Sequence, residues 1–279
     1  MKIGAMDEVI GKPWSGVFDE AARLGFDGVE LDLKVETYQD SEVWSAAGRK
    51  ALIERSKRAG VEIASVCMAS IARLMTNPAT HEQGVKAVAD LRRFCDELGA
   101  KVILFPMSKQ SPDQSEEEAV ALWRDGFKAA FEKSGGCKAL VGMESVGKVG
   151  RSAEQMLEMI RMVSPPGTIV QYVDDPRPGS PQPFGIDAIP MLGVYYDVGN
   201  AAYQGHDNLT EIPKLGRHLF QIHVKEIGAE MGQGKLDFPA IFAAIKKTGY
   251  DGYLILETEA GNDPAANAAR NLAFVRSLL

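Results

Sequence analysis

Short apolar runs alternate along the whole chain with longer segments in which apolar residues recur at helical spacing. The apolar runs predict strands at 2–6, 28–33, 62–67, 101–106, 140–144, 194–197, 220–225 and 253–257. The amphipathic segments predict helices, among them 17–24, 43–59, 83–98, 116–133 and 239–247. Strict alternation is typical of an α/β fold, and eight repeats predict one closed (β/α)8 TIM barrel over residues 1–279. An open doubly wound sheet is the alternative, although the first strand lacks the Gly-x-Gly-x-x-Gly turn of its dinucleotide-binding version.

The junctions between these segments carry start and stop signals for helices. Glycines that tolerate positive φ stand at three expected helix ends, Gly25, Gly60 and Gly99. Expected helix starts have a Ser or Thr followed three residues later by Glu or Gln, at Thr80, Ser115 and Ser152. The signals agree with the order of elements that the apolar pattern predicts.

One segment interrupts the alternation before the sixth strand. Residues 164–190 hold seven of the fourteen prolines of the chain. Proline cannot donate to a strand ladder, and a loop of this length inside a compact domain is usually functional. We therefore expect a proline-rich insertion that packs over the barrel mouth or against a neighbouring subunit.

Composition narrows the class of protein. The chain is 45% hydrophobic and 25% charged, as is typical of a globular protein, and no apolar run approaches the ~20 residues of a membrane span. Its net charge of −7 argues against nucleic acid as a partner, because that contact needs a basic stripe. The three cysteines are too few and too far apart for a disulfide framework. A cytoplasmic protein without nucleic-acid or membrane partners is the expectation.

Four of the predicted strands deliver a metal-binding group near their C-terminal ends, namely Glu144, Asp197, His223 and Glu257. In a (β/α)8 barrel these strand ends converge on the mouth where active sites are built. Three carboxylates and one imidazole make an oxygen-rich site that favours one Mn²⁺, with Mg²⁺, Co²⁺ or Zn²⁺ as alternatives. A divalent ion there would stabilise a developing enediolate of a keto-sugar. The alternative is that the carboxylates form ion pairs at the barrel rim.

The same strand ends lie in longer stretches that resemble a known family. The stretches are YDVGN at 196–200, IHVKE at 222–226, GQGKLDF at 232–238 and GYDGY at 249–253. They resemble the xylose isomerase-like TIM-barrel superfamily, and within it sugar and sugar-phosphate isomerases and epimerases of the L-ribulose-5-phosphate 3-epimerase and D-tagatose 3-epimerase kind. The resemblance implies that Glu144, Asp197, His223 and Glu257 bind one divalent metal. It also implies that Glu144 and Glu257 exchange protons with a small carbohydrate, in a homo-oligomer (a dimer or a tetramer).

Four further residues are candidates for substrate binding. Glu30 ends the second strand in the stretch GVEL at 28–31 and points toward the substrate or toward a metal ligand that it supports, with a structural carboxylate at the barrel rim as the alternative. Arg73, in the loop expected after the third strand, falls where the ribulose-phosphate epimerases carry an arginine, and it is expected to hold a phosphate or a hydroxyl. Lys225 shares a strand face with His223, and Asn200 lies one helical turn beyond Asp197.

The chain departs from the family pattern at positions that concern the substrate. The tagatose type has a histidine where Asn200 stands and an arginine in the loop at 226–231, and the ribulose-phosphate type has a histidine where Ile71 stands. The same scaffold also serves inosose and dehydroshikimate dehydratases and C-glycoside deglycosidase subunits, which remain alternatives. A phosphodiesterase resembling endonuclease IV is a weaker alternative, because its trinuclear zinc cluster needs several histidines and only one of the four in this chain stands at a strand end. The last alternative is a non-catalytic subunit that binds a sugar.

Overall fold

The computed structural model describes residues 1–33, 38–147, 151–164 and 191–279. Eight parallel strands pair in chain order, and β8 pairs back onto β1, so that they form a closed barrel. The strands are β1 (Lys2–Met6), β2 (Gly28–Asp32), β3 (Glu62–Cys67), β4 (Val102–Pro106), β5 (Leu140–Glu144), β6 (Leu192–Asp197), β7 (Leu219–Val224) and β8 (Tyr253–Leu256). The predicted (β/α)8 barrel is confirmed. The predicted proline-rich insertion, apart from its first residue, lies outside the described residues.

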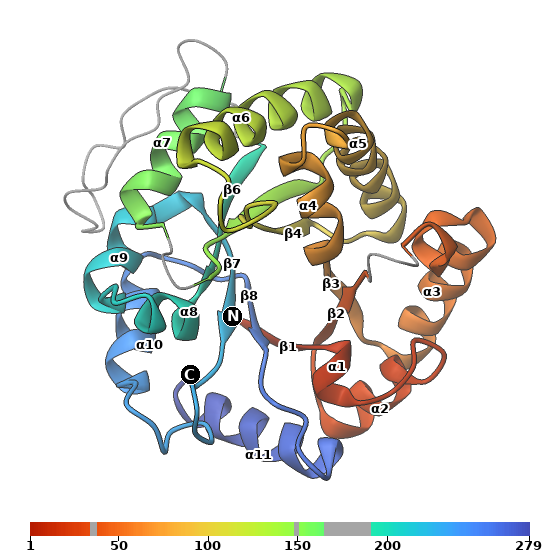
Figure 1. The fold of residues 1–279 in the computed structure, drawn as a ribbon. Coiled ribbons are helices and arrows are strands. Elements are labelled where there is room, and N and C mark those ends of the chain that lie inside the picture. Colours follow the sequence, from red (N-terminus) through yellow and green to blue (C-terminus); the bar gives the residue numbers. More distant parts are fainter. Residues whose placement is uncertain (34–37, 148–150, 165–190) are drawn as a thin grey trace.

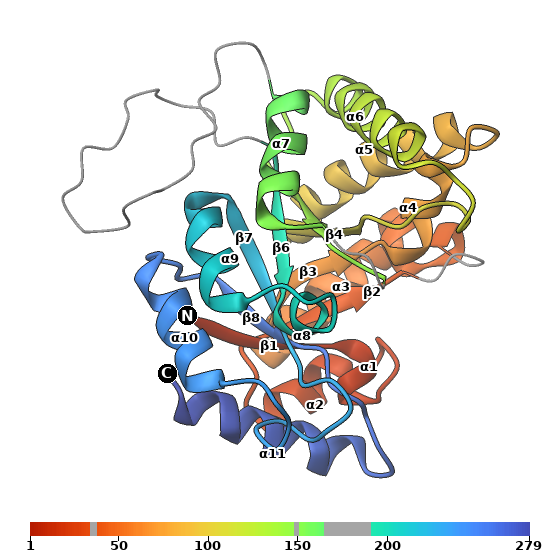
Figure 2. The same ribbon diagram turned by 60° about the vertical axis from the view of Figure 1, so that its left-hand side comes forward.

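Helices surround the strands in a ring (Figure 1). Figure 2 shows α9, α10 and α11 on one side of the barrel and α5 and α6 on the opposite side. The helices are α1 (Asp7–Ile10), α2 (Val17–Leu24), α3 (Ala46–Ala59), α4 (Ala69–Thr76), α5 (His81–Leu98), α6 (Glu116–Lys133), α7 (Ala153–Val163), α8 (Val198–Tyr203), α9 (Asn208–Leu215), α10 (Phe238–Lys247) and α11 (Pro264–Ser277). Short 3-10 turns are η1 (Tyr38–Asp40), η2 (Glu42–Trp44) and η3 (Gly216–His218). No helix among the described residues is long and apolar enough to cross a membrane.

Most of the helix signals read from the sequence act as expected. Gly25, Gly60 and Gly99 close α2, α3 and α5 with φ of 96°, 69° and 79°, where a side chain would be strained. Ser152 forms a complete capping box at α7, and Ser115 accepts a hydrogen bond from the N–H of Glu118 at the start of α6.

Two expectations about the segment after β3 are wrong. The Thr80 hydroxyl does not cap α5, because it donates to the carbonyl of Leu74 instead. Arg73 does not lie in a loop but on helix α4, with its side chain exposed. Helix α4 begins after Met68 without a side-chain cap, so no start signal marks it in the sequence.

The register of the barrel sets which side chains meet at its upper end. Asp197 is paired with His223 across β6 and β7, and Glu30 is paired with Met6 and Ser65 across β1, β2 and β3. Because side chains alternate between the inside and the outside of the barrel, these pairings direct polar groups into its interior just below the mouth.

Candidate metal centre and active site

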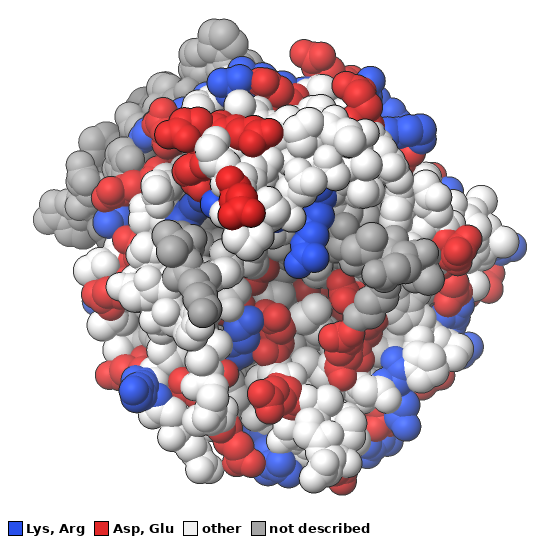
Figure 3. Space-filling view, viewed as in Figure 1, with Lys and Arg blue, Asp and Glu red and all other residues white. Residues whose placement is uncertain are grey.

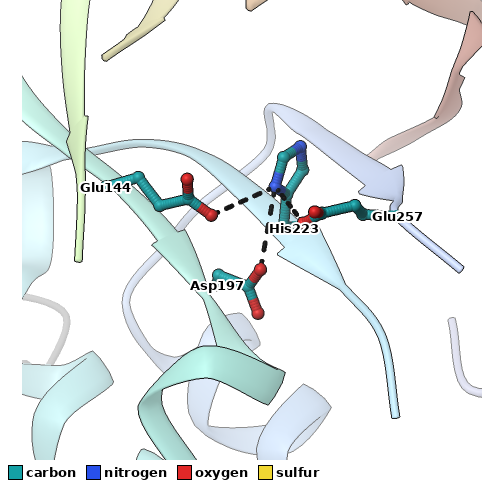
Figure 4. Close-up of side chains that lie close together, drawn as sticks. All are labelled: Glu144, Asp197, His223 and Glu257. Carbon is teal, nitrogen blue, oxygen red and sulfur yellow. Dashed lines mark ion pairs between the residues drawn. The ribbon is translucent and has the colours of Figure 1, made fainter. Parts of the chain in front are cut away.

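The four residues predicted to bind a metal come together at the barrel mouth. Glu144 ends β5, Asp197 ends β6, His223 is the penultimate residue of β7, and Glu257 follows β8. One ligand atom of each lies within 4.8 Å of the others. The Nδ1 atom of His223 lies 3.5 Å from Glu144 Oε1, 3.8 Å from Asp197 Oδ2 and 2.8 Å from Glu257 Oε2. Figure 4 shows the three carboxylates directed at this nitrogen.

The chemistry of these atoms fits a divalent cation. The Nε2 atom of His223 lies 2.9 Å from Glu30 Oε1, and a carboxylate only accepts, so Nε2 carries the ring hydrogen. When the ring is neutral, as a metal ligand must be, the Nδ1 lone pair points to the place where the three carboxylates converge. Atoms that bind one ion through bonds of ~2.0–2.3 Å lie within the 4.8 Å that separates the four ligand atoms at most. The four side chains are therefore suited to hold one divalent ion through oxygen and imidazole ligands.

Burial sets the protonation of two of these carboxyl groups. Glu144 is 5% and Asp197 4% exposed. Burial raises the pKa of Glu144 above its usual value, and the nearby His223 opposes that rise only in part. Burial together with the charge of Glu257 raises the pKa of Asp197 well above its usual value.

Electrostatic attraction outweighs burial at the other groups of the site. Burial alone would lower the pKa of His223, but the charges of Glu257 and Glu30 raise it. Burial would likewise raise the pKa of Glu257, but His223 and Lys225 hold it below its usual value. Burial disfavours the charge of Lys225, and Asp197 and Glu257 nevertheless raise its pKa. The two glutamates thus differ: Glu257 is held ionised and Glu144 is held closer to its neutral form.

Lys225 places a fixed positive charge beside the carboxylates. Its Nζ lies 2.8 Å from Asp197 Oδ2 and 2.8 Å from Glu257 Oε2. A Cβ atom on Gly199 would lie 2.6 Å from the Lys225 Cγ, so the glycine provides the space for this side chain. Lys225 was expected to contact substrate, and in this structure its ammonium group is bound to two of the predicted ligands.

Glu30 supports the site from below. It is fully buried, and its Oε2 accepts hydrogen bonds from Ser65 Oγ at 2.5 Å and Tyr195 Oη at 2.6 Å. Its Oε1 accepts the Nε2–H of His223. Both oxygens are therefore bonded to protein groups, and of the two roles expected for Glu30 its position fits the support of a ligand and not a substrate contact. The Nε2 amide of Gln221 in turn donates to both hydroxyls, at 2.6 Å and 3.0 Å.

Asn200 holds two of the predicted ligands in place. Its backbone N–H donates to Asp197 Oδ1 at 2.8 Å, which caps α8. Its side-chain amide donates to Glu144 Oε1 at 3.2 Å. Asn200 also lines the open cavity above these residues, so a substrate contact remains a prediction for it.

A cavity of about 440 Å³ opens above the predicted ligands. Its lining includes Arg73, whose guanidinium makes no ion pair with another described residue, together with Ser108 and Cys67. Glu8 and Asp32 also line it and were missed in the sequence. Asp32 ends β2, so the rule that identified the other strand-end carboxylates could have found it.

Comparison with known proteins agrees with this geometry. A model of the family described as "Xylose isomerase-like TIM barrel" matches residues 18–173 and 185–278. The chain is 23% identical over 279 residues to an L-ribulose-5-phosphate 3-epimerase of Escherichia coli (strain SMS-3-5 / SECEC), covering 96% of this chain and 90% of that protein. A D-allulose 3-epimerase from Methylomonas sp. has a TM-score of 0.75 at 15% identity, covering 100% of this chain and 97% of that one. A 3-keto-D-glucoside 4-epimerase from E. coli has a TM-score of 0.75 at 16% identity, covering 99% of each chain.

Proposed function

Because the chain belongs to the xylose isomerase-like TIM barrel family, we propose that it is a divalent-metal-dependent epimerase or isomerase of a keto-sugar or a sugar phosphate. Glu144 and Glu257 are the proposed acid and base. The observation that carries the proposal is that these two carboxylates approach His223 from opposite sides (Figure 4). Two carboxylates on opposite sides of a substrate can remove a proton from one face of a carbon and return one to the other face.

A divalent ion held by Glu144, Asp197, His223 and Glu257, with Mn²⁺ as the expected metal, would polarise the carbonyl of a keto-sugar and acidify its neighbouring C–H bond. Glu257, which His223 and Lys225 hold ionised, is suited to accept the proton of that C–H bond. Glu144 would also be ionised as a metal ligand, and its raised pKa suits it to take up a proton from solvent and to return it to the other face of the carbon. Asn200 and Lys225 each hold one of these glutamates in position. Arg73 lines the same cavity, and we expect it to meet a hydroxyl or phosphate oxygen of the substrate.

The relatives support this substrate class. Three relatives are named as epimerases, one of a ketose, one of a ketose phosphate and one of a keto-glucoside. An endonuclease-like trinuclear zinc site finds no support, because only one group of metal-binding residues occurs among the described residues, and it contains one histidine.

Hydrogen exchange with solvent tests the proposal. The purified protein, loaded with Mn²⁺, is incubated in D₂O with ketoses and their phosphates, and deuterium at the carbon next to the carbonyl is followed by NMR. We expect exchange together with a second stereoisomer or a positional isomer of the sugar. Loss of water from the sugar in place of isomer formation would indicate a dehydratase. No exchange with any sugar would refute the proposed reaction.

A further inference from the structure

A second cavity of about 500 Å³ adjoins the first at the barrel mouth. Glu8, from α1, and Asp32, from the end of β2, line both cavities. The rest of its lining comes from the segment between β1 and α2, which includes Trp14, from Leu33 just after β2, and from residues 40–42 at the junction of η1 and η2. We call this cavity the Trp14 groove. Small-molecule sites usually measure ~300–1,000 Å³, so each cavity is large enough for a ligand of its own.

The aromatic wall of the groove is fixed before any ligand arrives. The indole N–H of Trp14 donates to the carboxylate of Asp7, and the carbonyl of Trp14 accepts a hydrogen bond from Arg55 at 2.8 Å. Asp7 is itself buried and accepts a hydrogen bond from the backbone N–H of Glu8. Asp7 therefore links Trp14 to Glu8, a residue that lines both cavities. A side chain held in this way loses little conformational entropy when it contacts a ligand.

The chemistry of the lining favours a neutral polyhydroxy ligand over a phosphate. The described residues that line the groove include five carboxylates, Asp7, Glu8, Asp32, Asp40 and Glu42, and one amine, that of Lys12. Two of the carboxylates already have partners in the protein, since Asp7 accepts from Trp14 and Glu42 is paired with Arg55. Carboxylates accept hydrogen bonds from hydroxyl groups and repel phosphate oxygens. The indole offers an apolar surface for the C–H face of a sugar ring. Figure 3 shows red acidic patches on several sides of the central hollow of this face.

We propose that the substrate is a keto-sugar joined to a second, uncharged polyhydroxy unit such as a second sugar. The keto-sugar lies between Glu144 and Glu257, and the second unit lies in the Trp14 groove. This inference rests on the proposed function, because it assigns a substrate class to the same active site.

Binding to the metal-loaded protein tests the groove. The probes are fructose, fructose 6-phosphate and the four disaccharides in which glucose is attached to O3, O4, O5 or O6 of fructose, each titrated by calorimetry. We expect at least one disaccharide to bind about tenfold more tightly than fructose. We expect Trp14→Ala to weaken that disaccharide about tenfold, through loss of an aromatic contact. Asp40→Ala should weaken it about fivefold, through loss of one hydrogen bond.

Controls separate binding from folding. Asp40 is exposed, so its substitution should not disturb the core if Trp14→Ala proves unstable. Asp251 is an exposed aspartate in the turn before β8, at the opposite end of the barrel, and Asp251→Ala should leave the affinity for every probe unchanged.

The outcomes also separate this inference from the proposed function. The inference is overturned if no disaccharide binds more tightly than fructose, if fructose 6-phosphate binds most tightly, or if the groove variants bind the disaccharide as the wild type does. If a disaccharide binds through the groove but no sugar exchanges hydrogen with D₂O, the groove assignment stands and the proposed chemistry fails. If sugars exchange hydrogen but none binds more tightly when it carries a second unit, the proposed chemistry stands and the groove assignment fails.

Discussion

The hydrogen-bond network around Glu30 predicts that Glu30→Gln weakens metal binding without removing a ligand. The Glu30 carboxylate accepts three hydrogen bonds, from Ser65, Tyr195 and His223. A carboxylate only accepts, so both hydroxyls donate to Glu30, and each also accepts a hydrogen bond from the amide of Gln221. A glutamine has one accepting oxygen and one donating amide, and it cannot satisfy all three donors.

Either orientation of the new amide disturbs His223. If the oxygen faces the hydroxyls, the amide N–H₂ faces Nε2, and the ring must carry its hydrogen on Nδ1, the atom directed at the predicted metal position. If the oxygen faces Nε2, two hydroxyls lose their acceptor in a fully buried place. Loss of a residue that supports a metal ligand typically costs ~10–100-fold in affinity. At about 1.4 kcal/mol per tenfold, this is about 1.4–2.8 kcal/mol, close to the ~1.5–3 kcal/mol of a hydrogen bond to a charged group.

The assay is a competition titration of the metal-free protein with Mn²⁺ against a chelator of known affinity. The visible absorption of bound Co²⁺ reports the ligand geometry independently. Tyr195→Phe removes one of the three donors and should weaken Mn²⁺ binding less than Glu30→Gln. Glu132→Gln makes the same chemical change at an exposed site near the end of α6 and should have no effect. Wild-type Mn²⁺ affinity in a folded Glu30→Gln variant would show that the network does not orient His223.

Three further outcomes are expected. Glu144→Gln and Glu257→Gln should each lower turnover by ~10²–10⁴-fold at saturating Mn²⁺ with an unchanged circular dichroism spectrum; near wild-type turnover of either would contradict the two-glutamate mechanism. Removal of the metal should lower the free energy of unfolding, by about 2.7 kcal/mol relative to a metal concentration of 100 Kd, and calorimetry should show a lower Tm. Burial raises the pKa of Asp7 from its usual 3.8 to about 6, against the opposing hydrogen bond from Trp14. Ionising this buried group therefore costs the wild type stability as the pH rises from about 4 to 6, by about 3 kcal/mol. The free energy of unfolding of Asp7→Asn relative to wild type should rise over that interval in urea titrations and stay level above it, and a flat difference would contradict the shift.

The fold was predictable because each strand and helix carries its own local signal. Apolar runs bounded by glycine joints such as Gly60 and Gly99 give the strand positions to within two residues. Helix α4 was missed because Met68 provides no cap and its apolar residues continue those of β3. This omission placed Arg73 in a loop, although it does line the mouth.

The four predicted ligands were found for a topological reason, since in a barrel any residue at a C-terminal strand end faces one mouth. Glu30 was harder to interpret, because β2 continues for two more residues to Asp32. Strand alternation then directs Glu30 into the barrel beneath His223. The Trp14 groove could not be predicted at all. It depends on the contact of Trp14 with Asp7 and on the position of η1 and η2 beside α1. These are tertiary contacts, and no local sequence pattern predicts them.

The charges of the site explain why a cation and protons should compete for it. Four carboxylates, Glu30, Glu144, Asp197 and Glu257, surround His223 and Lys225. Even with both nitrogen groups charged, the negative charges are in excess. Burial and that excess raise the pKa values of Glu144 and Asp197, whereas the carboxylates raise the pKa of His223 against the effect of its burial. A divalent cation supplies the missing charge, but the carboxylates and the imidazole must lose their protons to bind it. Metal binding should therefore release protons from these groups, while Lys225, which is not a ligand, keeps its charge beside Glu257 throughout.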